Sequence, residues 1–291
     1  MSKLAAIIVT LVALGGTSRA NPSFEQAYAS APPPPAASNL WFEVGEQVIY
    51  NIYWGVIHVG TSHVTTDWVT YEDGRTLLSI RFESRSNKAI AMIYPVEDVQ
   101  HTLIDPESFL PVVSYKKSRQ GRRRYNEITR FDHEAGKAYW ESVEKEKKLT
   151  VDIESDTRDL ISLMYLTRSR ELEVGSEETM RVFTSEKIYD LFLKVPRKEP
   201  VKLKHYGEVE SLLIDPEAAF DGLFVRKGKV YLWISDDDRR LCTKIDAEVP
   251  VARVHIEIDR VLGPGDDFWV KAGEESPEAE NRNRGRSSFR R

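Results

Sequence analysis

Apolar and polar residues alternate one by one along several short segments of the chain. In residues 47–53, Val48, Tyr50 and Ile52 share one face of an extended segment, and their neighbours share the other. Residues 76–83 repeat this alternation. A two-residue period is typical of an antiparallel strand with one face in the core and one in water. The pattern therefore predicts a mainly β fold.

Short turn sequences separate these segments. A glycine in each turn can adopt the positive φ that a tight hairpin needs. The turns are residues 72–74, 119–122, 133–136 and 226–229, and two further alternating segments, 244–249 and 253–258, close the series. Many short strands at intervals of roughly 8–15 residues are typical of a sandwich, a barrel or a strongly curved sheet.

Two segments depart from the two-residue period. Residues 157–168 are apolar on nearly every side, with Asp156 as the expected N-cap. Asp159 then lies in the first turn, where a negative charge suits the helix dipole. We expect a buried helix that packs against the sheet. Residues 87–94 form a weaker helix candidate before Pro95.

Residues 1–20 have the three parts of a secretory signal peptide. Lys3 gives a basic start, residues 4–14 are apolar, and Ser18 and Ala20 offer small side chains at a cleavage site. The alternative, a buried N-terminal helix, does not account for the order of the three parts. We expect export, cleavage after Ala20 and a periplasmic mature protein. Because no cysteine stands directly after the apolar stretch, we expect no lipid anchor.

Both ends of the mature chain differ in composition from its middle. Residues 21–39 carry four consecutive prolines among small residues, which predicts a semi-rigid linker; a ligand for a proline-binding partner is the alternative. Residues 263–291 are charged and end in an Arg-rich stretch, so we expect a disordered tail. Residues 40–262 then form a single folded domain. No segment in it reaches the about 18 consecutive apolar residues of a membrane span, so we expect a soluble mature chain.

Composition excludes several classes of protein. The chain is 41% hydrophobic, 10% aromatic and 30% charged, which fills a core and rules out wholesale disorder or a fibrous repeat. The formal net charge of −5 argues against a general nucleic-acid binder. The single cysteine, Cys242, excludes a disulfide framework and a multi-cysteine zinc site. We expect this thiol to be a small buried apolar group.

The sequence contains no recognised catalytic or metal-binding motif. The six histidines show none of the short spacings of zinc sites. A nucleophile elbow, a phosphate-binding loop and a dinucleotide fingerprint are also missing. Residues far apart in the chain can still converge in the fold, so this weakens an enzymatic function without eliminating it. We predict no catalytic residues, no metal and no cofactor.

Two charged clusters stand out. Residues 236–238 are three aspartates followed by arginines at 239–240, which favours a charge-compensated turn over a calcium site, because the alternating ligands of calcium loops are missing. Residues 122–124 are three arginines that follow a basic segment at 116–119. They could bind phosphate, an anionic lipid or an acidic glycan. A solvated hairpin tip is the simpler interpretation, since exposed hairpin residues must be polar.

Several motifs occur in the order found in one bacterial family. The longest are Phe42-x-Val-Gly-Glu46, Val48-x-Tyr50-x-x-Tyr53-Trp54-Gly55, Tyr94-Pro95-Val96-x-Asp98, Asp159-Leu160-Ile161-Ser162-x-Met164-Tyr165-Leu166 and Leu232-Trp233-Ile234-Ser235-Asp236-Asp237-x-Arg239-Arg240-Leu241. With them, residues 40–260 resemble the exported family called domain of unknown function 3108. This chain departs from the family pattern at Cys242, where a proline is expected.

The resemblance implies a compartment and an architecture. It implies export to the bacterial envelope and a strongly curved antiparallel sheet, a half-barrel similar to that of periplasmic lipoprotein carriers, that wraps one buried helix. It carries over no catalytic residue. The residues shared with the family are mostly glycines at turns, aromatic residues and charged residues at strand ends, so neither the resemblance nor the residue pattern supplies a substrate.

A curved sheet lined by aromatic side chains and partly covered by a helix forms an apolar pocket. We therefore expect a non-enzymatic periplasmic protein that binds a lipid or another amphipathic envelope molecule on the concave face. The expected lining residues are Tyr50, Ile52, Trp54, Phe82, Met164 and Trp233. The same side chains could instead fill the core. The alternatives are an adaptor that contacts envelope proteins through strand edges and the charged tail and, more remotely, a hydrolase of an envelope polymer.

The signal peptide leads to a direct prediction. We expect the mature chain to begin at Asn21, because Ser18 and Ala20 occupy the small-residue positions of the cleavage site. N-terminal sequencing of the exported protein measures this, and an Ala20→Arg variant, which should remain uncleaved, serves as the control. A mature chain that retains residues 4–14 would contradict the prediction.

Overall fold

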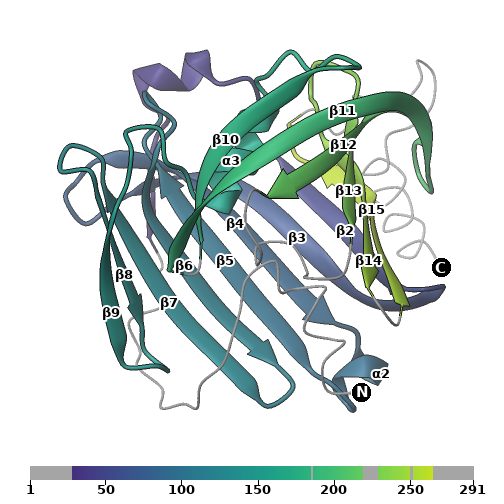
Figure 1. Cartoon of the computed structure of the whole chain (residues 1–291), viewed down its shortest axis with the longest axis horizontal. Helices are drawn as coiled ribbons and strands as arrows, with labels where there is room; N and C mark the ends of the chain where they lie inside the picture. The colour runs from purple at the N-terminus through teal and green to yellow at the C-terminus, as the bar shows by residue number, and fades with distance from the viewer. Residues whose placement is uncertain (1–27, 185, 219–228, 250–251, 265–291) are drawn as a thin grey trace, which may run out of the picture.

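The chain folds into one large, strongly curved antiparallel sheet with little helix (Figure 1). The structure is a computed structural model, and it describes residues 28–184, 186–218, 229–249 and 252–264. The expected signal peptide lies outside these residues. So do nearly all of the expected tail and most of the turn expected at 226–229.

Short connections join most of the strands. The strands are β1 (Ala29–Ser30), β2 (Gln47–Trp54), β3 (Ile57–Thr70), β4 (Thr76–Ser86), β5 (Val96–Ile104), β6 (Pro111–Gln120), β7 (Arg123–Asp132), β8 (Lys137–Ser142), β9 (Lys147–Asp152), β10 (Glu177–Thr184), β11 (Lys187–Leu203), β12 (Gly207–Ala218), β13 (Val230–Ser235), β14 (Cys242–Val249) and β15 (Ala252–Leu262). The helical segments are η2 (Pro35–Asn39), α2 (Lys88–Ala91) and α3 (Leu160–Thr167).

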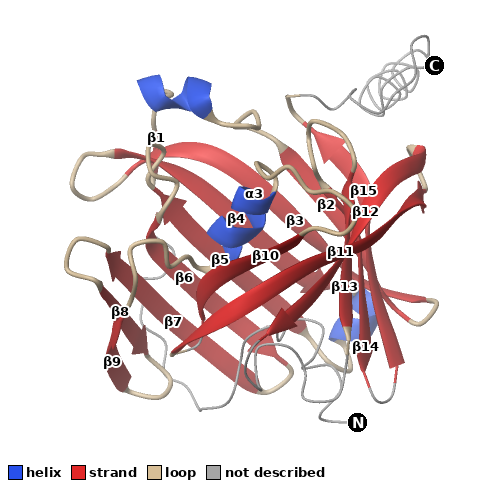
Figure 2. Cartoon of the chain, turned by 45° about the horizontal axis from the view of Figure 1, so that its top comes forward, coloured by secondary structure: helices blue, strands red, loops and turns tan. Residues whose placement is uncertain are grey.

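The strand order places two sequence neighbours at opposite edges of the sheet. The order is β10-β11-β12-β13-β14-β15-β2-β3-β4-β5-β6-β7-β8-β9, with β1 paired to β3. β9 and β10 follow one another in the chain, and α3 connects them across the hollow of the sheet (Figure 2). No ladder joins β9 to β10 in the described residues, so the sheet is not closed into a barrel.

Side chains join the two edges where backbone pairing does not. Phe183 of β10 packs edge-on against Phe131 of β7, with the ring centroids 5.9 Å apart. Beyond β10, the Glu186 carboxylate pairs with Lys145 Nζ at 2.6 Å and with Lys147 Nζ at 2.6 Å. The curl of the sheet therefore depends on packing and ion pairs along this seam.

The structure confirms the predicted fold class, a strongly curved antiparallel sheet around one helix. Strands form at the four alternating segments predicted from the sequence, as β2, β4, β14 and β15. The hairpin turns predicted after β3, β6 and β7 are also present. The weaker helix candidate forms as α2, shorter than expected, with Asn87 as its N-cap.

α3 begins later than the sequence suggested. Asp159, and not Asp156, is the N-cap, and its carboxylate accepts a hydrogen bond from the Ser162 N–H at 2.9 Å. Arg158 is extended and forms a bridge to β10, where the Phe183 N–H donates to the Arg158 carbonyl at 2.7 Å. Because this carbonyl is already used by β10, the helix starts only after Arg158.

The segment expected as a linker lies partly against the sheet. Ala29–Ser30 pair with β3, and the preceding Tyr28 hydroxyl lies 2.5 Å from the Tyr115 hydroxyl. The Tyr28 ring also contacts His101 edge-on, with centroids 5.9 Å apart. Residues 28–30, which fall within the segment 21–39 predicted as a semi-rigid linker, therefore contact the sheet. The polar, proline-rich composition of this segment gives no indication that the Tyr28 ring packs against the sheet.

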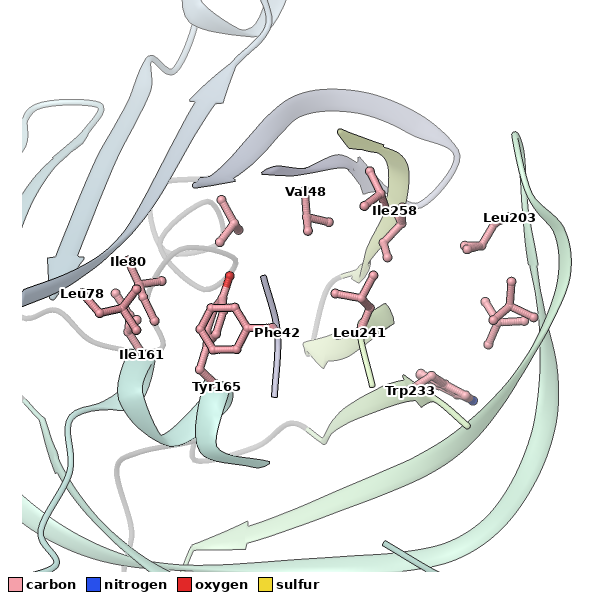
Figure 3. Close-up of a cluster of buried hydrophobic side chains, with 14 of the residues drawn as sticks. Phe42, Val48, Leu78, Ile80, Ile161, Tyr165, Leu203, Trp233, Leu241 and Ile258 are labelled. Atoms are coloured by element: carbon pink, nitrogen blue, oxygen red, sulfur yellow. The ribbon is translucent and has the colours of Figure 1, made fainter. Parts of the chain in front are cut away.

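α3 packs against both walls of the curved sheet. On one side, Ile161 and Tyr165 point toward Ile80 of β4 and toward Phe42, in the cluster that Figure 3 shows. On the other side, Leu163 joins the buried cluster formed mainly by β10 to β13. A helix that packs on both sides needs no polar face toward solvent, which agrees with the apolar composition of α3.

These contacts make α3 a core element, and we expect Leu163→Ala to lower the free energy of unfolding by roughly 2–5 kcal/mol. Leu163 is only 3% exposed, so its truncation removes buried contacts that the fixed walls cannot replace. Urea denaturation measures the loss, and far-UV circular dichroism near 20 °C should change little. Val174→Ala, at an exposed position, is the control. An unchanged unfolding midpoint for Leu163→Ala would show that α3 is a detachable cover.

Candidate ligand-binding site

An apolar cavity of about 140 Å³ lies between α3 and the concave face of the sheet. Residues of β2 to β4 form one wall, residues of α3 the second, and residues of β11 to β14 the third. The polar residues in its lining are Thr167, Arg168 and Arg240, besides two tyrosine hydroxyls and the Cys242 thiol. The cavity can therefore hold an apolar group but offers few hydrogen bonds.

The first wall follows directly from strand register. Val48 of β2 pairs with Val64 of β3, and Val64 pairs with Phe82 of β4. Directly paired residues of antiparallel strands point to the same face. The alternation seen in the sequence therefore becomes a row of apolar side chains across three strands.

The six expected lining residues divide into two groups. Tyr50, Phe82 and Met164 line the cavity. Ile52 is buried in the core but is not part of the cavity wall. Trp54 stands at the end of β2 with 41% of its surface exposed, because the strand leaves the concave region before this residue.

Trp233 points away from the cavity. Its neighbours Leu232 and Ile234 line the cavity, and successive side chains of a strand point to opposite faces. On the other face, the Trp233 Nε1–H donates to Glu199 Oε1 at 2.8 Å, and Lys244 Nζ lies 4.3 Å from the ring centroid. The sequence could not decide the face, because three consecutive residues of β13 are apolar.

A buried ion-pair network lies beside the cavity and includes Arg168 of its lining. Glu46 is 2% exposed and accepts two hydrogen bonds from Arg168, from Nη1 at 2.8 Å and from Nη2 at 3.1 Å. Arg239 Nη2 adds a third at 2.6 Å. The Arg168 guanidinium also lies 5.0 Å from the Tyr165 ring centroid, and its Nε–H donates to the Arg239 carbonyl. The Arg168 guanidinium therefore stabilises the fold through these contacts.

The network keeps Glu46 ionised in the core. Burial alone would raise the pKa of the Glu46 carboxyl, but Arg168 and Arg239 outweigh burial and lower this pKa below its ordinary 4.5. One carboxylate between two guanidiniums leaves one positive charge in excess beside the cavity. An anionic group bound nearby would be favoured by that charge.

Two further lining residues differ in what they can do. Burial raises the pKa of the Cys242 thiol to about 12, so the thiol stays protonated and is a poor nucleophile. Arg240 lies in the turn before β14, and its guanidinium has no hydrogen bond or ion pair within the described residues. Arg240 is therefore a cation available to a ligand in the apolar cavity.

A smaller polar cavity of about 40 Å³ lies beside the apolar one, and Leu160 of α3 lines both. Lys116 and Glu127 face each other across paired strands in its wall. The Lys116 ammonium is buried without a hydrogen-bond partner in the described structure. Burial lowers its pKa to about 8, although Glu127 and Asp98 oppose the change. The concave face thus changes from apolar to charged on passing α3.

The aspartate cluster at 236–238 has structural partners. Asp236 Oδ2 pairs with Lys198 Nζ at 2.5 Å, and Asp237 Oδ1 accepts hydrogen bonds from the backbone N–H groups of Arg239 and Arg240. The aspartates therefore build the turn that places Arg239 and Arg240 beside the cavity. Among the described residues, no cluster of three or more metal-binding side chains occurs. None of the described helices is long and apolar enough to span a membrane.

His101 and His255 are both held by neighbouring side chains. Burial lowers the pKa of His101 to about 4, and its Nε2 lies 2.8 Å from the Ser79 hydroxyl. His255 lies between Asp246 and Glu257, and the hydrogen bond to Asp246 raises its pKa. Neither ring lines the cavity.

Comparison with known proteins identifies a family and a fold. The model of one family, described as "Protein of unknown function (DUF3108)", matches residues 49–259. A β-barrel-like protein of the domain of unknown function DUF1849 from Brucella abortus is similar in structure, with TM-score 0.51 and 10% identity over 75% of this chain and 97% of that one.

Other comparisons add little. A Bacteroides fragilis protein with a YmcC-like fold matches with TM-score 0.28 and 10% identity, over 76% of this chain and 97% of that one. No curated protein matches the chain. The likeness to the Brucella abortus protein supports the fold alone, because identity is low.

The buried network predicts a pH-dependent loss of stability. We expect Glu46→Gln to cost roughly 3–5 kcal/mol at pH 7, because it leaves two buried guanidiniums without their carboxylate. Since the folded pKa of Glu46 lies below 4.5, its contribution is complete above that pH and is lost as the pH falls through the folded pKa. Urea denaturation at several pH values measures both effects.

The control for this prediction is Glu248→Gln, which breaks the exposed pair with Arg253 and should change stability little. The Glu46→Gln protein should also lack the part of the acid-induced loss that Glu46 causes in the unmodified protein. Equal stability of the two variants would show that the network contributes nothing to the fold.

Proposed function

Because the chain belongs to the DUF3108 family of proteins of unknown function, we propose a function from the geometry of its own site. The protein binds a hydrocarbon chain of a lipid or another amphipathic envelope molecule in the cavity beneath α3, and it acts as a binding protein and not as an enzyme. The observation that carries this proposal is the cavity itself, about 140 Å³ of apolar space between α3 and both walls of the sheet.

The size of the cavity limits the ligand. An apolar cavity of about 150 Å³ stays free of water and can take up benzene or xenon. Small-molecule sites commonly measure about 300–1,000 Å³. The cavity in its present form therefore fits the end of one hydrocarbon chain, and a longer chain must either extend out of it or displace α3. This favours a single-chain amphiphile over a bulky lipid.

Charge beside the cavity favours an anionic head group. Arg240 lines the cavity, its guanidinium has no partner among the described residues, and the Glu46 network adds one positive charge close by. A guanidinium binds a carboxylate or phosphate with two parallel hydrogen bonds. We place the head group of the ligand at Arg240 and its apolar end under α3.

Two observations support a binding protein in the envelope. The Cys242 thiol, whose pKa is about 12, is not an activated nucleophile, and His101, whose pKa is about 4, stays neutral at physiological pH and lies away from the cavity. Residues 1–20 carry the pattern of a secretory signal peptide, which supports the periplasm as the location.

Binding of laurate and of dodecanol to the full mature protein tests the proposal. We expect Met164→Trp, which fills the cavity, to weaken both ligands at least tenfold, a loss of about 1.4 kcal/mol. We expect Arg240→Gln to weaken laurate by a similar factor and dodecanol hardly at all, because only laurate carries a carboxylate. Native mass spectrometry and competition with a fluorescent fatty acid measure the affinities.

The control for the filled cavity is Val174→Trp, which adds the same side chain at an exposed position. This variant should bind both probes like the unmodified protein. If neither probe binds, or if Met164→Trp binds them as well as Val174→Trp does, the cavity is not a ligand site and the proposal fails.

One observation favours the second candidate, an adaptor between envelope proteins. β9 ends the strand order and pairs with β8 alone in the part of the chain that the structure describes, so one of its edges has no strand beside it there. Such an edge can accept a strand from another protein. Lys147 of β9 already pairs with Glu186, which blocks part of the edge, so we rank this function second.

A further inference from the structure

Five large apolar side chains lie exposed at one end of the sheet. They are Trp54, Val56, Ile57, Met92 and Ile93, and the exposed fraction reaches 96% for Val56, 84% for Met92 and 86% for Ile93. Single exposed apolar side chains are common on any protein. Several at one place mark a contact surface.

Hydrogen bonds of Asn87 bring the two groups of apolar side chains together. Val56 lies in the turn between β2 and β3, and Met92 and Ile93 directly follow α2 (Figure 1). Asn87, the N-cap of α2, donates a hydrogen bond from Nδ2 to the His58 carbonyl at 2.7 Å. α2 is therefore tied to the first residues of β3, beside the turn that carries Val56.

A basic turn lies at the same end. The Gly121 N–H donates to the Pro95 carbonyl at 2.8 Å, which holds the turn between β6 and β7 against the residues after α2. Gly121 has a φ of 61°, and a Cβ there would come within 2.8 Å of the Tyr94 ring, so this approach requires glycine. Next to it, Arg122 and Arg123 are exposed.

The cations at this end exceed the anions that could neutralise them. Arg122, Arg123 and Lys88 are exposed, and none of the three has a hydrogen bond or an ion pair within the described parts of the chain. Of the exposed carboxylates nearby, Glu97 on β5 is 3.8 Å from Arg119 and Glu248 is 2.6 Å from Arg253, so both already have partners. The surface therefore combines exposed apolar side chains with unpaired positive charge.

We propose that this end of the sheet, formed by the turn at 54–57, residues 88–93 and the turn at 121–123, docks on an anionic lipid bilayer. The apolar side chains enter the boundary between head groups and acyl chains, and the cations contact lipid phosphates. A basic surface with apolar side chains at its tips is the pattern of proteins that lie at a membrane surface.

The arrangement of charge favours a membrane over a protein partner. The buried centre of a protein interface is depleted of charged residues. Here Lys88, Arg122 and Arg123 flank the apolar tips, so a flat protein partner would have to desolvate unpaired cations at a cost. A bilayer surface supplies phosphates beside an apolar interior, so both kinds of side chain find partners at once.

Flotation with vesicles tests this proposal on the full mature protein. We expect binding to vesicles of phosphatidylcholine that contain about 30% phosphatidylglycerol, because the anionic lipid gives them a negative surface. We expect weak binding to vesicles of pure phosphatidylcholine. Arg122→Glu/Arg123→Glu should weaken binding at least tenfold, and added salt should have a similar effect. Val56→Asp/Met92→Asp should weaken binding at least tenfold and leave secondary structure unchanged, because both residues are exposed.

Matched controls separate this surface from other contributions. Lys202→Glu/Lys204→Glu changes the same charge at exposed positions near the turn between β11 and β12, and should keep at least half of the binding. Val174→Asp places the same carboxylate at another exposed apolar position and should bind normally. All variants keep the Arg-rich residues 282–291, so any contribution from them stays constant.

A variant of the cavity separates docking on vesicles from ligand binding in the cavity. Met164→Trp fills the cavity and should leave vesicle binding unchanged, whereas lipid uptake into the cavity would make vesicle binding fall in that variant. Equal binding to the two vesicle types would overturn the proposal. So would variants of the docking end that bind like their matched controls.

Discussion

The site depends on one buried ion-pair network that fixes the position of α3. Glu46 lies just before β2, Arg168 is the C-cap of α3, and Arg239 lies between β13 and β14, so the network joins the helix to both walls. Breaking such a pair costs more than forming it gains. At the other end, Asp159 accepts hydrogen bonds from the hydroxyls of Thr102 and Ser114. With both ends held, α3 spans the hollow and leaves the cavity beneath it.

The sequence predicted the fold well because the sheet is built from local signals. Alternation in 47–53 and 76–83, together with glycines in the turns, is sufficient for strands and hairpins, since both depend on neighbouring residues. The start of α3 could not be predicted in the same way. Asp156 and Asp159 are equally good N-caps by sequence, and the choice is made by β10, which uses the Arg158 carbonyl. That contact joins residues 25 positions apart (Arg158 to Phe183), so no pattern in the sequence around Asp159 indicates it.

The site was harder to predict, because its members are known only once the curvature is known. Tyr50 and Phe82 could be found from alternation, whereas Trp233 shares an apolar run with its neighbours and could have faced either side. Glu46 and Arg240 were missed as site residues because a charged residue in a sequence indicates a surface position. Glu46 has another glutamate three positions before it, and Arg240 ends the run of five charged residues 236–240, so neither position differs from its neighbours in the sequence.

One row of paired residues joins the apolar and polar parts of the concave face. From β3 to β7 it runs Val64, Phe82, Gln100, Lys116 and Glu127, each directly opposite the next. Paired residues point to one face, so polarity increases steadily across four strand boundaries. A sheet that only had to enclose a core would gain nothing from the buried Lys116 ammonium, which has no hydrogen bond to any described residue. The gradient divides the concave face into an apolar part beneath α3 and a charged part on β6 and β7.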